Sequence, residues 1–188
     1  MARAKAKAKQ TQRGGRGNDA IALLKADHRQ VEDWFEQFEK ARTDDRKQDL
    51  ATKICKALKV HTTIEEEIFY PAFLEATEDK DMHHEAEIEH DSAKKLIAEI
   101  EASGPDDEYY DSKVKVLSEM IKHHVKEEEQ SGGMFAEARD SEMDLQALGE
   151  QLATRKAELE GGEDDEDDMP PPKRGRDRSQ TTRMARGT

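Results

Sequence analysis

Cysteine, proline and long apolar runs are scarce in this chain, and each shortage excludes a class of protein. The single cysteine, Cys55, excludes an intramolecular disulfide and a metal cluster held by several cysteines, and we interpret it as a small core residue. Only five prolines occur, and residues 19–160 contain almost no alternating β-branched runs, so we predict helices and no strand. No apolar stretch approaches the roughly 20 residues that a membrane helix needs, and no apolar signal core follows the basic N-terminus. We therefore expect a cytoplasmic protein without membrane contacts.

The two ends of the chain have the composition of disordered tails. Residues 1–17 carry six basic residues, no acidic residue and several glycines. Residues 161–188 begin with two glycines, continue with the acidic run EDDEDD, and end with MPPPKRGRDRSQTTRMARGT. We predict a disordered basic tail at 1–17 and a disordered acidic-then-basic tail at 161–188.

The segment between the tails is strongly acidic, with 19 basic and 37 acidic residues over 18–162. This negative charge opposes contact with a phosphate backbone. The basic tails could bind nucleic acid, or could bind the acidic faces of the protein itself. Nucleic acid is therefore a less favoured partner, and the sequence leaves the oligomeric state open.

Four amphipathic segments fill the middle of the chain, at residues 19–42, 46–77, 80–102 and a fourth stretch that begins after Gly104-Pro105. The pair Gly132-Gly133 interrupts the fourth stretch and leaves an appended helix at 141–160. Short links join successive helices, so neighbouring helices are antiparallel. We predict an all-α fold, an up-down-up-down four-helix bundle at 18–140 with an extra C-terminal helix.

Each predicted helix has one inward stripe, and polar side chains interrupt the apolar residues of that stripe. They are His28 in the first stripe, His61 and Glu65 in the second, His90 with His83 as a further candidate in the third, and His124 and Glu128 in the fourth. After Glu65 the second stripe continues with Ile68 and Ala72. Buried carboxylates and imidazoles without partners cost several kcal/mol, whereas a pair of metal ions would satisfy them together.

The spacing of these residues supports one shared centre. His61 with Glu65, and His124 with Glu128, are i, i+4 pairs about 6 Å apart along one helical face. The pattern also repeats, because the next candidates lie at +33 and +37 from His28 and at +34 and +38 from His90. We therefore predict a two-metal site whose ligands are His28, His61, Glu65, His90, His124 and Glu128.

Four segments, one from each predicted helix, read LLKADHRQVEDWF, HTTIEEEIFYPAF, EIEHDSAKKLI and HHVKEEEQSGGMFAEAR. They resemble the four helices of the hemerythrin-like family, often called HHE cation-binding domains, over approximately residues 19–140. The resemblance implies two non-haem iron ions, bridged by two carboxylates and an oxo or hydroxo group. It also implies reversible dioxygen binding or redox sensing. By motif, the family's ligand positions fall on the same six residues.

The third helix departs from the pattern of the oxygen-carrying hemerythrins, which place two histidines four residues apart there. In this chain the upstream position is Ala86. The resemblance then implies an iron coordination position that is open or is filled by water, His83 or Glu87, which disfavours simple oxygen transport. Ferritin-like di-iron bundles need Glu-x-x-His on two helices, and only Glu87 with His90 shows that motif here.

Three functions stay open. A binding or sensing protein needs reversible ligation at an iron shielded by apolar residues such as Leu24, Leu58, Ile68 and Ile97. A di-iron enzyme with peroxide-disproportionating, catalase-like activity needs an accessible site and a proton donor. Tyr70 and the additional polar groups of the third helix are candidates for this donor, although we interpret Tyr70 first as packing. A metal-free structural bundle would use its tails for partner contacts. We favour a di-iron protein that handles or senses dioxygen, peroxide or iron.

The remaining polar residues near the stripes have simpler interpretations. We expect His84 to face solvent and His123 to be a partly exposed neighbour of the fourth stripe. Charge runs are typical of solvated helix faces. Those charged residues that lie beside the two i, i+4 pairs could also contact the metal ligands from behind. The residues in these runs are Glu66, Glu67, Glu127 and Glu129.

Overall fold

The computed structural model describes residues 19–162, and within this range the chain forms helices and short connections but no strand. The predicted tail at 1–17, and the part of the other predicted tail beyond residue 162, lie outside the described residues. Gly161 and Gly162, which we assigned to the tail, instead form the last residues of the final helix. A glycine costs a helix only about 1 kcal/mol relative to alanine, so a helix can continue through glycine at its last positions. Within 19–162, no helix has both the length and the apolarity to cross a membrane.

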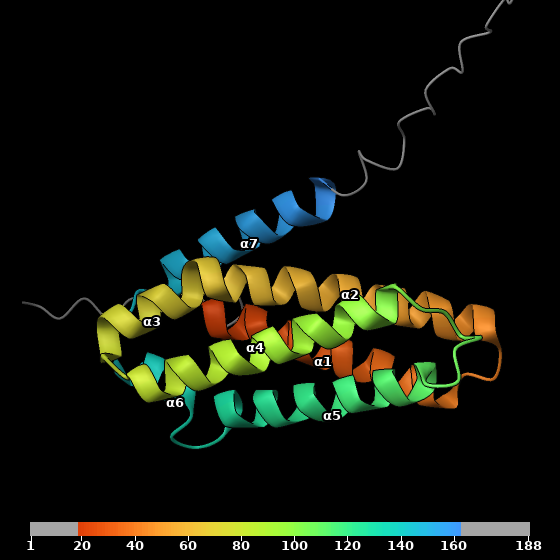
Figure 1. The fold of residues 1–188 in the computed structure, drawn as a ribbon. Helices are drawn as coiled ribbons and strands as arrows, with labels where there is room; N and C mark the ends of the chain where they lie inside the picture. The colour runs from red at the N-terminus through yellow and green to blue at the C-terminus, as the bar shows by residue number, and fades with distance from the viewer. Residues whose placement is uncertain (1–18, 163–188) are drawn as a thin grey trace, which may run out of the picture.

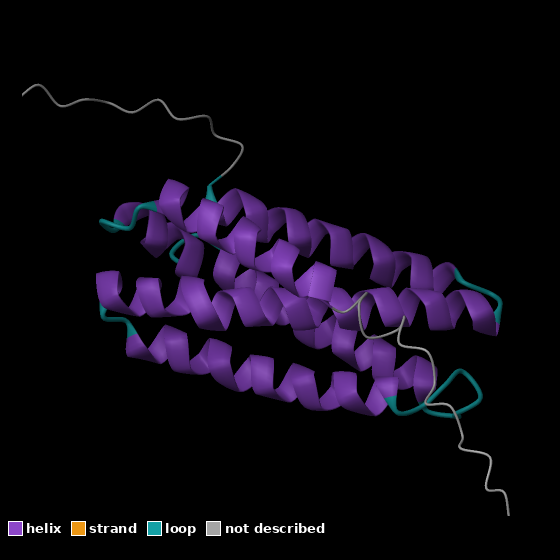
Figure 2. Cartoon of the chain, turned by 90° about the horizontal axis from the view of Figure 1, so that it is seen from above, coloured by secondary structure: helices purple, strands orange, loops and turns teal. Residues whose placement is uncertain are grey.

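The helices are α1 (Ala20–Lys40), α2 (Asp44–Ile64), the π-helical turn η1 (Glu65–Phe69), α3 (Tyr70–Thr77), α4 (Lys80–Glu101), α5 (Tyr110–Glu129), α6 (Met134–Asp140) and α7 (Leu145–Gly162). The segments α2, η1 and α3 follow one another without a break and form one long rod (Figure 1). This rod packs with α1, α4 and α5 into an antiparallel bundle, seen from two sides in Figures 1 and 2. The predicted all-α, up-down-up-down four-helix bundle is confirmed. The appended helix α7 lies outside the bundle, against α1 and α2.

Side-chain caps mark where two of the bundle helices begin. The carboxylate of Asp19 accepts a 2.8 Å hydrogen bond from the backbone N–H of Ala22 at the start of α1. The carboxylate of Asp79 accepts a 3.0 Å bond from the N–H of Met82 at the start of α4. Because the first N–H groups of a helix have no partner within the helix, these side chains stabilise the first turns and set their positions.

The π-helical turn η1 changes which face of the rod points inward. The sequence predicted that Ile68 and Ala72 continue the stripe, but both are only partly buried. Phe69, Tyr70 and Phe73 are buried in their place. A π turn adds one residue to the helical repeat, so the positions after it rotate around the axis. The predicted stripe was therefore wrong beyond Glu65, because the prediction assumed a regular α-helical period and the π turn adds one residue to it.

Two apolar clusters fill the bundle on either side of a polar layer. The first includes Val31, Phe35, Leu58, Ala93, Ile97 and Leu117. The second includes Leu24, Ile64, Phe69, Ala86, Met134 and Phe135. On α1, α2 and α4 the inward positions between the two clusters are occupied by His28, His61 and His90 respectively. The polar layer is therefore enclosed by apolar packing above and below.

Two glycines allow the chain to turn back sharply after α5. Gly132 has a φ of 76°, in the left-handed region that glycine adopts without steric cost. A Cβ on Gly133 would lie 2.1 Å from the backbone carbonyl oxygen of Glu127, so a larger residue does not fit there. The turn places α6 across the end of the bundle, where the ring of Phe135 stacks on the imidazole of His28 with centroids 5.8 Å apart.

Candidate metal centre

The six residues proposed from the sequence as metal ligands converge in the polar layer. They come from four elements of the bundle, and none is more than 5% exposed: His28 on α1, His61 on α2, Glu65 at the start of η1, His90 on α4, and His124 and Glu128 on α5. Buried histidine and glutamate side chains need partners that water would otherwise supply. Their mutual arrangement shows what kind of partner fits.

The four imidazoles form two pairs. The Nε2 atoms of His28 and His61 lie 3.0 Å apart, and the Nε2 atoms of His90 and His124 lie 3.2 Å apart. Two nitrogen ligands at about 2.1 Å from one ion, at right angles to each other, are separated by about 3 Å. Each pair therefore has the spacing of two ligands to a single metal ion.

The two glutamates lie between the histidine pairs. Oε2 of Glu65 is 3.2 Å from Nε2 of His61 and 3.4 Å from Nε2 of His90. Glu128 places Oε2 3.4 Å from Nε2 of His28, and Oε1 3.6 Å from Nε2 of His124. Each carboxylate thus reaches one histidine of each pair. This is the position of a carboxylate that bridges two ions.

Within the part of the chain that the structure describes, three carboxylate oxygens at the centre have no hydrogen-bond donor, namely both oxygens of Glu65 and Oε2 of Glu128. Glu65 is completely buried and Glu128 is 2% exposed. A buried charged oxygen without a donor is costly, and metal coordination removes that cost. The residues present therefore fit a pair of cations.

The pKa values at the centre also indicate a shortage of positive charge. Burial raises the pKa of Glu128 to about 7, and the negative charge of Glu65 adds to this effect. Burial acts in the same direction on Glu65, but the imidazoles of His61 and His90 outweigh it and lower that pKa to about 2. Burial lowers the pKa of His28 to about 4, so this imidazole is neutral and able to donate a lone pair. Burial acts against the charged form of His90, but the carboxylates of Glu65 and Glu66 outweigh it and raise that pKa to about 9, so the carboxylates at the centre favour added positive charge.

A second ring of carboxylates surrounds the four histidines. The Nδ1 atoms lie 2.8 Å from Oε1 of Glu129 for His28, 2.9 Å from Oε1 of Glu66 for His90, and 2.7 Å from Oε2 of Glu89 for His124. His61 has a longer contact, 3.6 Å from Nδ1 to Oδ2 of Asp27. An Nδ1 contact of this kind leaves Nε2 as the ligand atom, fixes the ring orientation and raises the basicity of the ligand.

Sequence reasoning left open a role for Glu66 and Glu129 behind the ligands, but it missed Asp27 and Glu89. A signal was available, because each of the four carboxylates directly precedes or follows one of the six central residues in the chain. The four neighbours are Asp27 before His28, Glu66 after Glu65, Glu89 before His90 and Glu129 after Glu128. These carboxylates obey the same internal repeat as the central residues.

Tyr70 is the site residue that sequence reasoning interpreted first as packing. Its hydroxyl lies 3.1 Å from Nε2 of His90 and donates a 3.2 Å hydrogen bond to Oε1 of Glu128. On the other half of the centre, Phe135 stacks on His28 and offers no polar atom. The two halves therefore share their ligand types but differ in the aromatic residue beside them. The π turn η1, which sequence periodicity does not register, aims Tyr70 inward.

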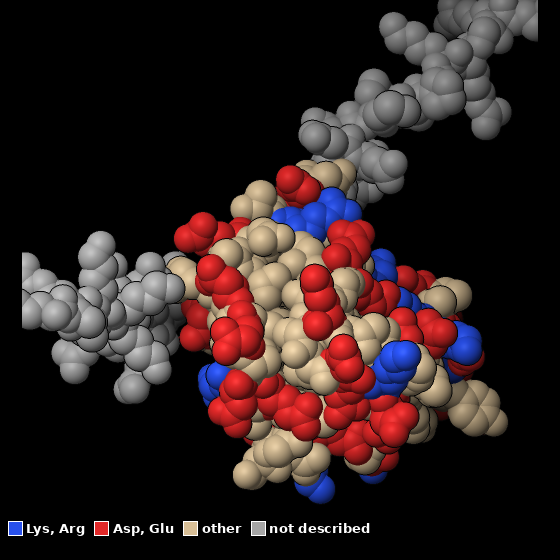
Figure 3. Space-filling view, turned by 90° about the vertical axis from the view of Figure 1, so that its left-hand side faces the viewer, with Lys and Arg blue, Asp and Glu red and all other residues tan. Residues whose placement is uncertain are grey.

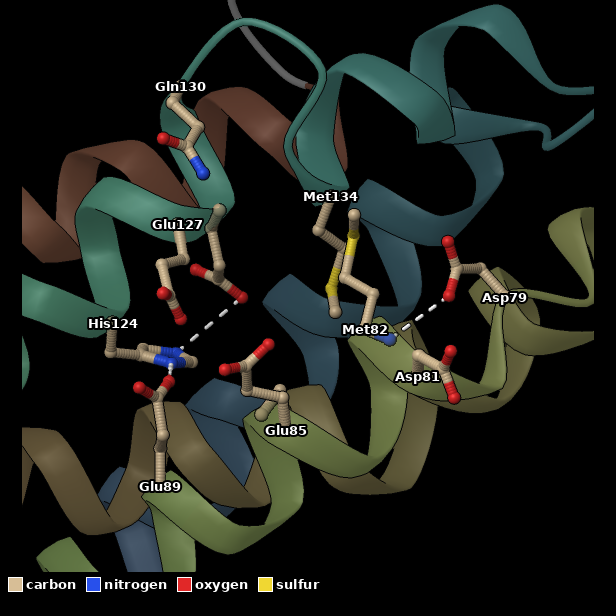
Figure 4. A pocket seen from close by; sticks show the side chains of 11 residues that line it. Asp79, Asp81, Met82, Glu85, Glu89, His124, Glu127, Gln130 and Met134 are labelled. Atoms are coloured by element: carbon tan, nitrogen blue, oxygen red, sulfur yellow. Dashed lines mark hydrogen bonds and ion pairs between the residues drawn. The ribbon is translucent and has the colours of Figure 1, made fainter.

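Ala86 is buried one turn before His90 and lines a pocket of about 250 Å³. The pocket lies between α4, α5 and α6 and opens to solvent (Figure 4). The pocket reaches His124 and Glu128 at its inner end. His83, a further candidate from the sequence, lies apart from the histidine pairs, with Nδ1 3.5 Å from Oε2 of Glu87 and its ring edge-on to Tyr70. Two other histidines are exposed at the surface, His84 and His123.

The fold and the sequence both have known relatives. A hemerythrin HHE cation binding domain-containing protein from Mycobacterium kansasii, a homologue of Rv2633c, has a similar crystal structure, with a TM-score of 0.64 at 20% identity over 77% of this chain and 88% of that chain. A DNA nickase from Nostoc sp. (strain PCC 7120) is 27% identical over 119 residues, which are 63% of this chain and 33% of that protein. The chain thus spans about a third of that relative's length. Residues 19–131 match the family model of the hemerythrin HHE cation binding domain. Because this match covers more than half of the sequence, the chain belongs to the hemerythrin HHE cation-binding domain family.

Proposed function

We propose that this protein binds two iron ions and uses them to handle or sense dioxygen or peroxide. His28 and His61 would hold one ion, His90 and His124 the other, and Glu65 and Glu128 would bridge them. The observation that carries the proposal is the pair of buried glutamates, each within 3.6 Å of one histidine from either pair, with three oxygens that have no donor.

The donor set favours iron over zinc. Each ion would have two imidazole nitrogens and two shared carboxylates, which is a nitrogen and oxygen set without sulfur. Structural zinc sites are closed and tetrahedral, and they commonly include cysteine. Here Cys55 is buried in the first apolar cluster, among residues of the core. Two iron ions held in this way would supply a redox pair with coordination positions open to a small ligand.

The protein's own residues would control access and protons at this centre. Leu24, Leu58 and Ile97 are at most 2% exposed and exclude water from the polar layer on both sides. Tyr70 is almost completely buried, and burial together with the charge of Glu65 raises the pKa of its hydroxyl well above the ordinary value. The hydroxyl therefore keeps its proton at neutral pH, next to Glu128.

The position of Tyr70 favours a second candidate function, the disproportionation of peroxide. Such a reaction needs a proton donor within hydrogen-bond reach of the reacting group and a path from solvent. The Tyr70 hydroxyl and the pocket beside Ala86 offer these two features. Reversible dioxygen binding does not need the proton donor, so the position of the Tyr70 hydroxyl supports reaction with peroxide more than transport.

Metal analysis of the purified protein after aerobic loading with iron tests the proposal. We expect about two iron atoms per chain, because the six central residues form two matching sets. One tightly held zinc, or no metal, would contradict the di-iron proposal and favour a structural bundle. Release of dioxygen from added peroxide by the loaded protein would then separate the enzyme from a binding protein. The cytoplasmic location, and nucleic-acid contacts through the tails, stay predictions from the sequence.

A further inference from the structure

The pocket that leads to the centre has an acidic lining. Its carboxylates come from Asp79, Asp81, Glu85, Glu89, Glu127 and Glu128, and no lysine or arginine within residues 19–162 lines it. The side chains of Glu85, Glu89 and Glu127 project into the same space beside His124 (Figure 4). The end of the bundle at which α4 begins is also mainly acidic (Figure 3). A cleft lined by charges of one sign concentrates ions of the opposite sign.

The inner end of this pocket carries an oxygen that has no partner. Glu128 lines the pocket, is 2% exposed, and has no hydrogen-bond donor at its Oε2. The small side chain of Ala86 forms part of the same wall. A cation that moves inward along the carboxylates would therefore reach a buried acceptor.

A compact group of cation-binding side chains lies beside this pocket and outside the six central residues. Donor atoms of Glu89, His123 and Glu127 all lie within 4.8 Å of one another. Nε2 of His123 is 3.5 Å from Oε1 of Glu89 and 3.2 Å from Oε1 of Glu127. His123 is 60% exposed, so the group is open to solvent. One imidazole and two carboxylates suit a divalent first-row metal ion.

Glu89 connects this group to the centre. One of its oxygens faces His123, and the other lies 2.7 Å from Nδ1 of His124, whose Nε2 points into the polar layer. Glu127 directly precedes Glu128 on α5 and lines the same pocket. The exposed group and the buried centre thus share neighbouring residues along one short path.

We infer that Glu89, His123 and Glu127 form an outer cation site that captures ferrous ions from solvent and passes them through the acidic pocket to the centre. The inference rests on the proposed function, since it takes iron to be the cargo. The outer site holds the ion weakly, because its side chains are partly exposed, whereas the six buried residues retain it.

The first test measures the rate of iron uptake by the full chain. Metal-free protein is mixed with Fe²⁺ in the absence of oxygen. A chelator that forms a coloured complex with Fe²⁺ is added at successive times, and the iron that the chelator does not bind is counted as taken up by the protein. The variant carries His123→Ala with Glu127→Gln, and Glu89 is left intact because it also contacts His124. The control carries Glu39→Gln alone, which removes the same charge from an exposed position outside the pocket, and His84 is left intact because it forms another candidate cation group with His83 and Glu87.

We expect the wild type and the control to acquire iron at the same rate, and the His123/Glu127 variant to acquire it about tenfold more slowly with the same final amount. Equal rates in the variant and the control would overturn the inference, as would a variant that never reaches the final amount. Matching circular dichroism spectra and unfolding midpoints establish that the variants are folded.

The second test does not depend on the buried centre. Mn²⁺ is titrated into each protein, and the bound ions are counted by electron paramagnetic resonance. The wild type and the control should bind one more Mn²⁺ per chain than the His123/Glu127 variant, and equal counts would contradict the outer site. If the wild type retained no iron in the first test but showed the extra Mn²⁺ here, the proposed di-iron function would fail while the outer site would stand.

Discussion

The hydroxyl of Tyr70 donates a 3.2 Å hydrogen bond to Oε1 of Glu128, although the two residues lie on different helices and far apart in the chain. The same hydroxyl is 3.1 Å from Nε2 of His90, and Phe135 takes the place beside His28 on the other half of the centre. Among the described residues, the aromatic neighbour of one half of the centre therefore carries a hydroxyl, whereas the aromatic neighbour of the other half carries none. That asymmetry suits a reaction in which a proton is delivered to one end of a small ligand.

Replacing Tyr70 with phenylalanine should separate metal binding from reactivity. The ring packing stays and the ligands are unchanged, so we expect the Tyr70→Phe protein to retain its iron. Loss of the hydroxyl removes the proton donor, and peroxide turnover should fall by about 10²-fold or more. Tyr110→Phe, which changes a buried tyrosine of the other apolar cluster, is the matched control. Unchanged turnover in Tyr70→Phe would show that the hydroxyl takes no part in the reaction.

The two inward histidines of α4 should differ sharply in their effect on metal content. His90 is 1% exposed and lies in the polar layer, whereas His83 contacts Glu87 and the ring of Tyr70 away from it. We expect His90→Ala to lose half or more of the bound iron and His83→Ala to lose almost none. Atomic absorption on both purified variants measures this, and equal losses would refute the proposed ligand set.

The second ring of carboxylates, which contacts the Nδ1 atoms of the four histidines, should affect how tightly iron is bound. Glu66→Ala removes the partner of Nδ1 of His90, and loss of such a partner weakens metal binding by about 10–100-fold. The neighbouring Glu67 is exposed and pairs with Arg155 on α7 instead, so Glu67→Ala is the matched control. Competition with a chelator of known affinity gives both values. A similar loss in the two variants would mean that general negative charge, and not the Nδ1 contact, is responsible.

The thiol of Cys55 should be unreactive in the native protein. Burial raises its pKa to about 12, so at pH 8 only about one thiol in 10⁴ carries the reactive negative charge. An aromatic disulfide reagent should label the native chain very slowly and the chain in guanidinium chloride rapidly. Fast labelling under native conditions would contradict the packing of the first apolar cluster.

The helical bundle and the grouping of the six polar residues could be predicted from the sequence, because inward positions recur with the helical period. The repeat from His28 and from His90 predicted that two helical pairs contribute alike, and all six side chains meet in the structure. That they bind metal stays a prediction. Burying charged and polar side chains from four separate helices without a partner costs free energy, and this cost makes a coincidental grouping of these residues improbable.

The structural features that could not be predicted from the sequence are those that do not repeat with the helical period. The turn η1 inserts one residue, which moved Tyr70 and Phe69 inward in place of Ile68. In the acidic run that begins at Glu65, Glu66 contacts His90 whereas Glu67 faces α7, and only the packing of the helices distinguishes these two neighbours. From the sequence alone, Glu66 and Glu67 are both expected to lie on a solvated helix face.

The most direct test of a two-iron centre is an anomalous difference map from crystals of the iron-loaded protein, measured at the iron absorption edge. Two peaks per chain are expected, one beside the Nε2 atoms of His28 and His61 and one beside those of His90 and His124, with Glu65 and Glu128 between them. A single peak, or peaks that do not touch both histidine pairs, would contradict a two-iron centre held by these six residues.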